Sequence, residues 1–330
     1  MAGEAIRPFY LGIDIRGASA HAGVVDDTGK AIGSVANPTH AERGSEQGVL
    51  QICRTAREAV MASALTLDDI EAVGICCRGP LDLTEQILLS PPNLPGWLNL
   101  PLPQLVGEQL GVRAVLQNDA NAVAFAEHWV GAGQGANSLA LFTLGSSIGC
   151  GILLRGQLLE GAHSHAGEAG HLRIALEQPR RNTTGLFGSL EAYASATAMV
   201  DRTREALVAG ESSELLDATD RGEKLTAAFI FERATAGDAL CERIVDETAF
   251  YLAVGAVNVM HLVDPEVVLF SGAMTDAGPG FLEKIRSCVR ENALPILADA
   301  TRIDYASLGS DAGFIGAAGC ARKIFATSPS

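Results

Sequence analysis

Short blocks of hydrophobic residues, separated by polar turns, dominate the first third of the chain and predict strands. The blocks lie at residues 9–15, 20–25, 31–35, 72–77 and 112–117. Short turns join the first three, which is typical of a meander of antiparallel strands. Apolar residues over 49–60 instead recur at intervals of three and four, so this segment is predicted to be a helix.

The rest of the chain repeats the order of strands followed by helices. Strands are predicted at residues 138–144, 148–154 and 267–270, and helices at 190–207, 225–232, 238–262 and 311–325. The last helix is rich in Gly and Ala, so we expect it to pack closely against its neighbours. Two successive sets of strands and helices predict an α/β protein with two lobes.

Composition and charge narrow the class of protein. Of the 330 residues, 48% are hydrophobic and 19% are charged, which is typical of a globular protein. The net charge of −15 argues against nucleic-acid binding, because it repels phosphate backbones. The seven cysteines are scattered without a CxxC pair, and the chain shows no apolar leader or membrane-spanning run, so we expect a reduced, cytoplasmic protein.

A polar turn at Asn118 and Asp119 is the first candidate for chemistry. It follows the predicted strand over 112–117 and precedes an alanine-rich helical segment. Open α/β folds build their sites at the carboxyl ends of strands. A carboxylate there can accept a proton from a hydroxyl group, as phosphoryl transfer to an alcohol requires. Asn and Asp are also common helix N-caps, so the position alone leaves both interpretations open.

Three glycine-containing turns are candidates for binding phosphate. They lie at residues 14–18, 145–151 and 271–272, each beside a predicted strand. Glycine lets backbone N–H groups approach phosphate oxygens, and serine hydroxyls add donors. Glycine is also frequent in ordinary hairpin turns, and neither a P-loop nor a dinucleotide-binding motif occurs in its required context.

Several longer motifs resemble those of one family over nearly the whole chain. They include QNDANAVAFAEHW at 117–129, TLGSSIGCGILLRGQL at 143–158, EGAHSHAGEAGHL at 160–172 and SLEAYASATAM at 189–199. Together they resemble the ROK family of sugar kinases and related repressors. The resemblance implies an α/β protein with the two-lobed actin-like ATPase (ribonuclease H-like) fold and an interlobe cleft. The lobes would comprise residues 1–118 and 119–310, and a C-terminal helix at 311–330 would return to the first lobe.

The resemblance also implies roles for individual residues. Asp119 matches the base that takes the proton from the sugar 6-hydroxyl. The positions that match sugar contacts are Gly79, Asn118, Glu168, His171 and Glu191. The positions that match the nucleotide site are Asp14, Gly17, Gly145, Ser146, Gly149, Gly151 and Gly272, with Mg²⁺ expected near Asp14. Without the family pattern, His171 also fits a core histidine and Glu191 a first-turn helix carboxylate.

The chain departs from the family pattern where many ROK proteins bind zinc. Those proteins hold the metal through three cysteines and a histidine, between the Gly-His and Leu-Glu-Ala-Tyr segments. Residues 177–188 contain no cysteine, and four-coordinate structural zinc needs its thiolates. We therefore expect no structural zinc, and packing by Leu186 and Phe187 in its place.

The two phosphate loops depart as well. Arg16 and Ala18 stand where the family usually has Gly and Thr, and Ser147 stands where it has Gly. Arg16 could reach a phosphate and compensate by its charge, or it could only fill the space. Because Asp119 is intact, an active kinase is favoured over a degenerate one.

These matches imply ATP-dependent phosphorylation of the 6-hydroxyl of a hexose, most simply glucose. A kinase of N-acetylglucosamine or N-acetylmannosamine shares all the sugar residues, so that alternative stays open. A catalytically weak, sugar-sensing regulator is a third alternative, because the substitutions in the two phosphate loops could weaken catalysis. The expected partners are the sugar and a second copy of the chain in a homodimer, with neither nucleic acid nor a membrane.

Overall fold

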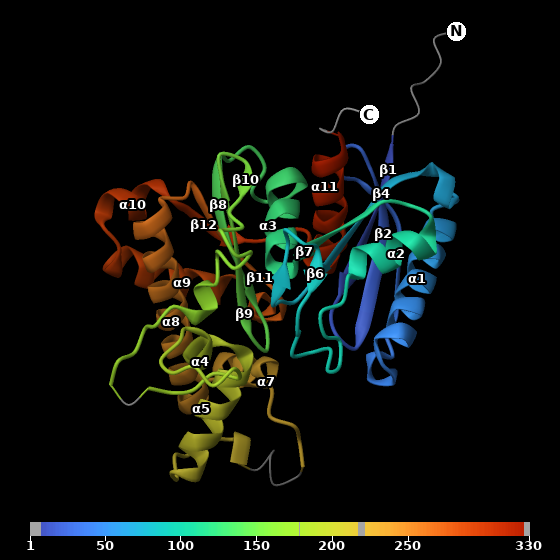
Figure 1. Ribbon diagram of the computed structural model, residues 1–330. Coiled ribbons are helices and arrows are strands. Elements are labelled where there is room, and N and C mark those ends of the chain that lie inside the picture. Colours follow the sequence, from blue (N-terminus) through green and yellow to red (C-terminus); the bar gives the residue numbers. More distant parts are fainter. Residues whose placement is uncertain (1–7, 178, 217–221, 327–330) are drawn as a thin grey trace. The chain divides into compact units, whose positions relative to one another are not determined.

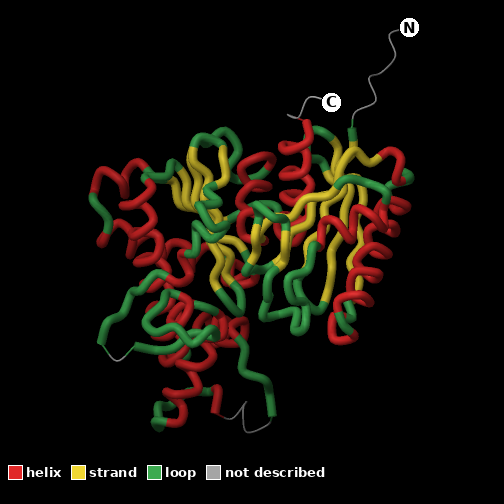
Figure 2. The backbone as a smooth tube through the Cα atoms, in the orientation of Figure 1, coloured by secondary structure: helices red, strands yellow, loops and turns green. Residues whose placement is uncertain are grey.

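The computed structural model describes residues 8–177, 179–216 and 222–326, and its contacts divide the chain into two compact units. The first unit comprises the chain up to Gly135, the segment Gly151–Gly167 and the segment that begins at Ser307. The second comprises Ala136–Cys150 and Glu168–Ala306. Each unit is built around a sheet with helices packed on it (Figures 1 and 2).

The sheet of the first unit has five strands in the order β3-β2-β1-β4-β7. Their bounds are Phe9–Ile15 (β1), Ser19–Asp26 (β2), Ala31–Pro38 (β3), Ile70–Cys77 (β4) and Ala114–Asn118 (β7). The first three form the predicted antiparallel meander, whereas β1, β4 and β7 run parallel. The carboxyl ends of β1, β4 and β7 therefore meet at one edge of the sheet. A small hairpin, β5 (Leu81–Asp82) with β6 (Ile87–Leu88), follows β4.

Helices cover both faces of this sheet, and alternate residues of β1 show which helix lies on which face. Leu11 and Ile13 belong to the core that contains α1 (Ser45–Ala62) and α2 (Leu102–Leu110), whereas Tyr10 belongs to the core beneath α11 (Ala312–Ala326). In Figure 1, α11 lies beside α3 (Asp119–Val130), the helix that starts at the polar turn. The first unit thus extends past residue 118, because α3 packs on α11.

The packing of α11 depends on glycines, as the Gly- and Ala-rich sequence suggested. A Cβ atom at Gly74 in β4 would overlap the Ala317 carbonyl, and one at Gly316 would overlap the Ala122 carbonyl in α3. Backbone therefore approaches backbone at both contacts, closer than any side chain permits. The helix is held tightly against the strand and the helix that carry the predicted site.

A buried carboxylate fixes the start of the C-terminal segment. Glu127 in α3 is fully buried, and its oxygens accept hydrogen bonds from the backbone N–H groups of Ser307 (2.9 Å) and Leu308 (2.8 Å) and from that of Ala132 (2.7 Å). A buried charge is tolerated when donors surround it in this way. Glu127 thereby ties the chain that leads into α11 to α3.

The second sheet has the order β10-β9-β8-β11-β12. The strands are β8 (Ser138–Leu144), β9 (Ile148–Leu154), β10 (Gln157–Leu158), β11 (Val267–Ser271) and β12 (Arg302–Tyr305). The helices of the second unit are α4 (Glu191–Ala194), α5 (Ala196–Val208), α7 (Ala227–Thr235), α8 (Ala239–Val263), α9 (Pro279–Asn292) and α10 (Pro295–Ala300). Strand β11 runs parallel to both β8 and β12.

The single helix predicted over 190–207 is wrong in one respect, since the structure contains two. Ser195 between α4 and α5 is extended, with φ −72° and ψ 161°, and its side chain accepts a hydrogen bond from the Ala198 N–H. Serine is a strong N-cap, so a new helix starts there despite the continuous apolar pattern.

Among the described helices, none is long and apolar enough to cross a bilayer.

Candidate active site

The first unit gathers four of the predicted residues at one edge of its sheet. Strand register pairs Asp14 in β1 with Cys76 in β4, and Cys77 with Asn118 at the end of β7. Gly79 lies just beyond β4, where a Cβ atom would be 4.0 Å from the Asn118 Nδ2 atom. Asp119 is the first residue of α3, directly after Asn118.

The local hydrogen bonds of Asn118 and Asp119 explain why a helix begins here. The Asn118 Oδ1 atom accepts the Asn121 N–H at 3.1 Å and caps α3. The Nδ2 group is not used by this cap and can donate to another partner. The Asp119 Oδ1 atom accepts the Ala120 N–H at 2.9 Å. The N-terminus of a helix stabilises negative charge, so this carboxylate is held where it can act as a proton acceptor. The N-cap and the chemical interpretations of the turn are therefore compatible.

Asp14 has an unexpected partner in Arg16. The Asp14 side chain is largely buried, and its Oδ2 atom accepts a 2.6 Å hydrogen bond from Arg16 Nε. The same guanidinium donates to the Ser310 carbonyl at 2.6 Å. A Cβ atom at Gly313 would overlap the Asp14 carboxylate, so the start of α11 lies directly against it. Gly17, which follows Arg16, has a φ of 84° and accepts a hydrogen bond from the Thr39 hydroxyl through its carbonyl.

The thiols beside these carboxylates are chemically inert. Burial raises the pKa of Cys76 well above its usual value, and the nearby Asp14 and Asp119 carboxylates raise it further. Burial and the same two carboxylates act alike on the pKa of Cys77. Both cysteines are therefore neutral thiols, the poorly nucleophilic form.

The second unit gathers most of the predicted phosphate-binding residues around the turn from β8 to β9. The Gly145 N–H donates to the Ser147 carbonyl at 3.0 Å, and the Gly149 N–H donates to the Thr143 hydroxyl at 3.2 Å. Strand register places Ser271 beside Thr143, and a Cβ atom at Gly272 would overlap the Leu144 carbonyl. The turn after β11 thus lies against the hairpin.

This hairpin rests on the N-terminus of α5. The Ala196 N–H donates to the Gly145 carbonyl at 2.9 Å, and the Thr197 hydroxyl donates to the Ser146 carbonyl at 3.0 Å. Gly151 stands apart from this group, because it lies inside β9, where a Cβ atom would be 2.5 Å from the Ala120 carbonyl oxygen. The structure explains Gly151 by close packing.

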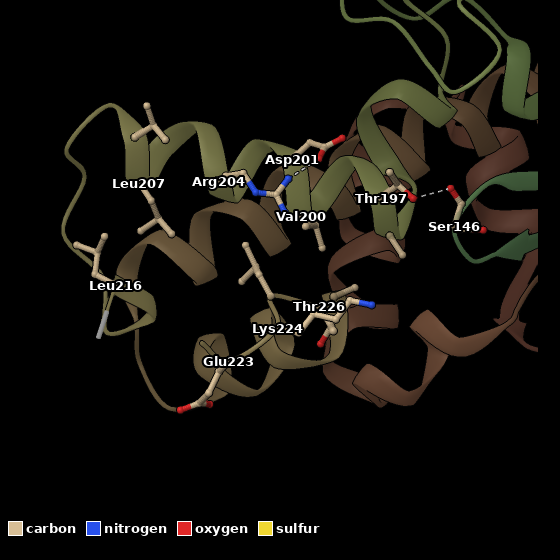
Figure 3. A pocket seen from close by; sticks show the side chains of 14 residues that line it. Ser146, Thr197, Val200, Asp201, Arg204, Leu207, Leu216, Glu223, Lys224 and Thr226 are labelled. Carbon is tan, nitrogen blue, oxygen red and sulfur yellow. Dashed lines mark hydrogen bonds and ion pairs between the residues drawn. The ribbon is translucent and has the colours of Figure 1, made fainter. Parts of the chain in front are cut away.

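Beside the hairpin lies a hollow of about 930 Å³, with Ser146 at one end (Figure 3). It is lined mainly by α5, including Thr197 and Val200, and by residues 223–226, which lead into α7, and its lining includes the charged residues Asp201, Arg204 and Lys224. A second hollow of about 340 Å³, on the side of the turn after Gly272, shares the linings Ala196 and Ala227 with the first. Sequence reasoning missed both, because apolar faces of helices are also typical of a core.

The three remaining sugar-site candidates lie together in the second unit. The His171 Nε2 atom is 3.7 Å from the Glu168 Oε2 atom. Glu191 is buried, and its Oε2 atom accepts the Ile148 N–H at 3.1 Å, so it also holds the first residue of β9 after the β8–β9 turn. The Thr183 hydroxyl donates to the Glu191 Oε1 atom at 3.2 Å.

The expected packing of Leu186 and Phe187 is wrong. Their exposed fractions are 52% and 44%, so neither forms a core in place of zinc. Polar contacts hold the segment instead: Arg180 donates two hydrogen bonds to the Glu205 carboxylate, at 2.5 and 2.7 Å. The next residue, Arg181, also contacts the segment, because its guanidinium lies 4.0 Å from the Phe187 ring centroid.

Within the described part of the chain, no group of three or more His, Cys, Asp or Glu side chains is placed to hold a metal ion. Because residues 177–188 contain no cysteine, we predict that purified protein contains no stoichiometric zinc by elemental analysis. Treatment with a zinc chelator should leave its denaturation midpoint unchanged, because no thiolate site supports the segment. One tightly bound zinc per chain would contradict this prediction.

The similarity to known proteins agrees with this geometry. The model of the ROK family matches residues 10–324. The chain belongs to the ROK family. A glucokinase from Thermotoga maritima is 32% identical over 308 residues, which are 93% of this chain and 95% of that protein. The motif-based resemblance is thus confirmed.

Solved structures of ROK proteins share the fold. The ROK hexokinase from Thermus thermophilus is 30% identical, with a TM-score of 0.81 over 97% of this chain and 100% of that one. The ROK family glucokinase from Streptomyces griseus, solved in complex with glucose and AMPPNP, is 30% identical, with a TM-score of 0.77 over 96% of this chain and 99% of that one. The predicted actin-like α/β fold is confirmed.

Proposed function

We propose that this ROK protein is a sugar kinase that transfers the γ-phosphoryl group of ATP to the 6-hydroxyl of glucose. The observation that carries the proposal is the placement of Asp119 at the start of α3, next to Asn118 and Gly79, at the carboxyl ends of parallel strands. The similarity to glucokinases over 93% of the chain supports it.

In the proposed reaction Asp119 accepts the proton of the 6-hydroxyl as that oxygen attacks the γ-phosphorus atom. The Asn118 amide is fixed by its capping bond, so its Nδ2 group can orient the same hydroxyl. Glu168, His171 and Glu191 would bind the other hydroxyls. Such a set of donors and acceptors selects strongly, because a sugar with a missing or inverted hydroxyl leaves some of them without a partner.

The nucleotide is proposed to lie in the second unit, with its phosphates at the hairpin of Gly145, Ser146 and Gly149. The hollow that starts at Ser146 would then take the nucleoside. A magnesium ion fits Asp14 as its protein ligand, because Mg²⁺ is commonly held by one or two carboxylates plus substrate phosphates. When bound, the ion neutralises phosphate charge. Arg16 Nε donates to the Asp14 Oδ2 atom at 2.6 Å, so the ion would bind the other carboxylate oxygen or displace this pair.

Filling the hollow should weaken nucleotide binding selectively. Ala227 lines both hollows, so Ala227→Phe should raise the KM for ATP by about tenfold or more, which corresponds to roughly 1.4 kcal/mol of lost binding. The KM for glucose serves as the internal control and should change less than about twofold. Steady-state kinetics with each substrate varied in turn measures both. Equal changes in the two KM values would contradict this placement of the nucleoside.

A coupled assay of ADP release against a panel of sugars tests the proposed function. We expect the highest kcat/KM with glucose. A preference for N-acetylglucosamine or N-acetylmannosamine would keep the mechanism and replace the substrate. Sugar binding without any ADP release would favour a sensor instead.

A further inference from the structure

We propose that Asn182 is a positioning residue that fixes the tautomer of His171, so that His171 meets the sugar as a hydrogen-bond donor through Nε2–H. This inference rests on the proposed function, because it assumes that His171 contacts the substrate. It concerns a residue outside the family motifs described above, in the segment that lacks the cysteines. The Asn182 Nδ2 atom lies 3.2 Å from the His171 Nδ1 atom.

The orientation of the Asn182 amide is decided by its other partners. Its Oδ1 atom lies 3.1 Å from the Thr184 N–H and 2.9 Å from the Leu186 N–H. Backbone N–H groups can only donate, so the atom that faces them must be the oxygen. The NH₂ group then faces His171.

The orientation of the amide determines where the imidazole carries its proton. An amide NH₂ can only donate, so the His171 Nδ1 atom must accept and cannot itself hold a proton. In the neutral ring the proton is therefore on Nε2. That nitrogen lies 3.7 Å from the Glu168 carboxylate. A donor and an acceptor at this spacing suit sugar hydroxyl groups, each of which both donates and accepts.

Thr183, the residue after Asn182, contacts a second side chain that is proposed to bind the sugar. Thr183 donates its hydroxyl to Glu191, so two consecutive residues hold two of the proposed sugar-binding side chains. The segment around them is self-supporting, because the Asn182 N–H donates to the Leu186 carbonyl at 2.9 Å and the Arg180–Glu205 pair anchors its start. The structure of this segment thus holds His171 and Glu191 in place.

Asn182→Asp separates this role from a merely structural one. The aspartate keeps the oxygen that accepts the bonds of Thr184 and Leu186, and it loses only the donor to His171. Thr184→Val is the matched control, because it removes the Thr184 hydroxyl bond to Asn182 (2.9 Å) and leaves the contact with His171. Both variants should be assayed at about pH 9, well above the value of roughly 6.5 at which an ordinary imidazole loses its proton.

We expect the KM for glucose to rise about 10- to 100-fold in Asn182→Asp, with kcat within about threefold of the native value. In Thr184→Val the KM should stay within about twofold. A change in Asn182→Asp no larger than that in the control would overturn the proposal.

The tautomer can be observed without any activity, which separates failure of this inference from failure of the proposed function. In ¹⁵N-histidine-labelled native protein, the His171 signals, assigned by their loss in His171→Gln, should show a protonated Nε2 and an unprotonated Nδ1. In Asn182→Asp the pattern should reverse. A protonated Nδ1 in the neutral native ring would overturn the proposal, even if the variants failed to fold.

Discussion

Replacing Asp119 by Asn should lower kcat by about 10²–10⁴, because the amide keeps the shape of the side chain and cannot accept the proton of the attacking hydroxyl. The KM for glucose should change much less, since the proposed sugar contacts of Asn118, Glu168 and His171 remain. Steady-state kinetics of purified variant and native protein at the same pH measures both constants.

Asp68→Asn is the matched control for this substitution. Asp68 is an exposed carboxylate in the same unit, within the short 3₁₀ helix Leu67–Asp69, and it should be replaced with less than about twofold effect on kcat. Turnover of Asp119→Asn within tenfold of the native rate, in a folded protein, would remove Asp119 from the role of general base.

The largest expected effect on stability is that of Gly316→Ala. A Cβ atom there would overlap the Ala122 carbonyl of α3, and two backbones cannot move apart without disturbing the packing of α11 on the sheet. Overpacking of this kind costs about 1–3 kcal/mol and occasionally more, so we expect a loss of at least about 2 kcal/mol in the free energy of unfolding. Chemical denaturation followed by circular dichroism measures the loss.

Gly280→Ala in α9 is the control, because it is the same change in a helix where no atom lies near the added carbon. Alanine is the better helix former, so this variant should be equally or slightly more stable than the native protein, by up to about 1 kcal/mol. If Gly316→Ala were as stable as Gly280→Ala, the close contact between α11 and α3 would be contradicted.

The sequence predicted those parts of the fold in which burial follows a regular pattern. Strand β1, buried at nearly every position, and the long helix α8 were both located to within a residue or so. Helix α2 was not predicted because it is only nine residues long, and Pro101 and Pro103 stand at its N-terminus, where no side chain caps the helix. Strand β12 was missed because its four residues, RIDY, are too few for their alternation to stand out from chance.

Some residues of the candidate site could be identified from the sequence, and others could not. Asn118 and Asp119 were selected as candidates because they follow a buried strand and match a motif of the family, and the parallel strands bring them near Gly79. Asn182 was not recognisable, because its importance comes from one contact with His171 across a segment of irregular structure. The sequence showed only that this segment lacks the cysteines of the family's zinc site. The sequence identified both Arg16 and Asp14 but not the bond between them, because the direction of a side chain within a turn depends on its packing.

The most direct test of the central claim is to identify the product. Native protein should be incubated with ATP, Mg²⁺ and glucose, and the reaction followed by ³¹P and ¹³C NMR. Our account predicts one ADP per phosphorylated sugar, with phosphorus coupled to carbon 6 of glucose, and no product when 6-deoxyglucose is supplied. Phosphorylation at any other hydroxyl, or product from 6-deoxyglucose, would contradict the assignment of Asp119 as the base at the 6-hydroxyl. ADP formed without any phosphorylated sugar would contradict the proposed kinase activity itself.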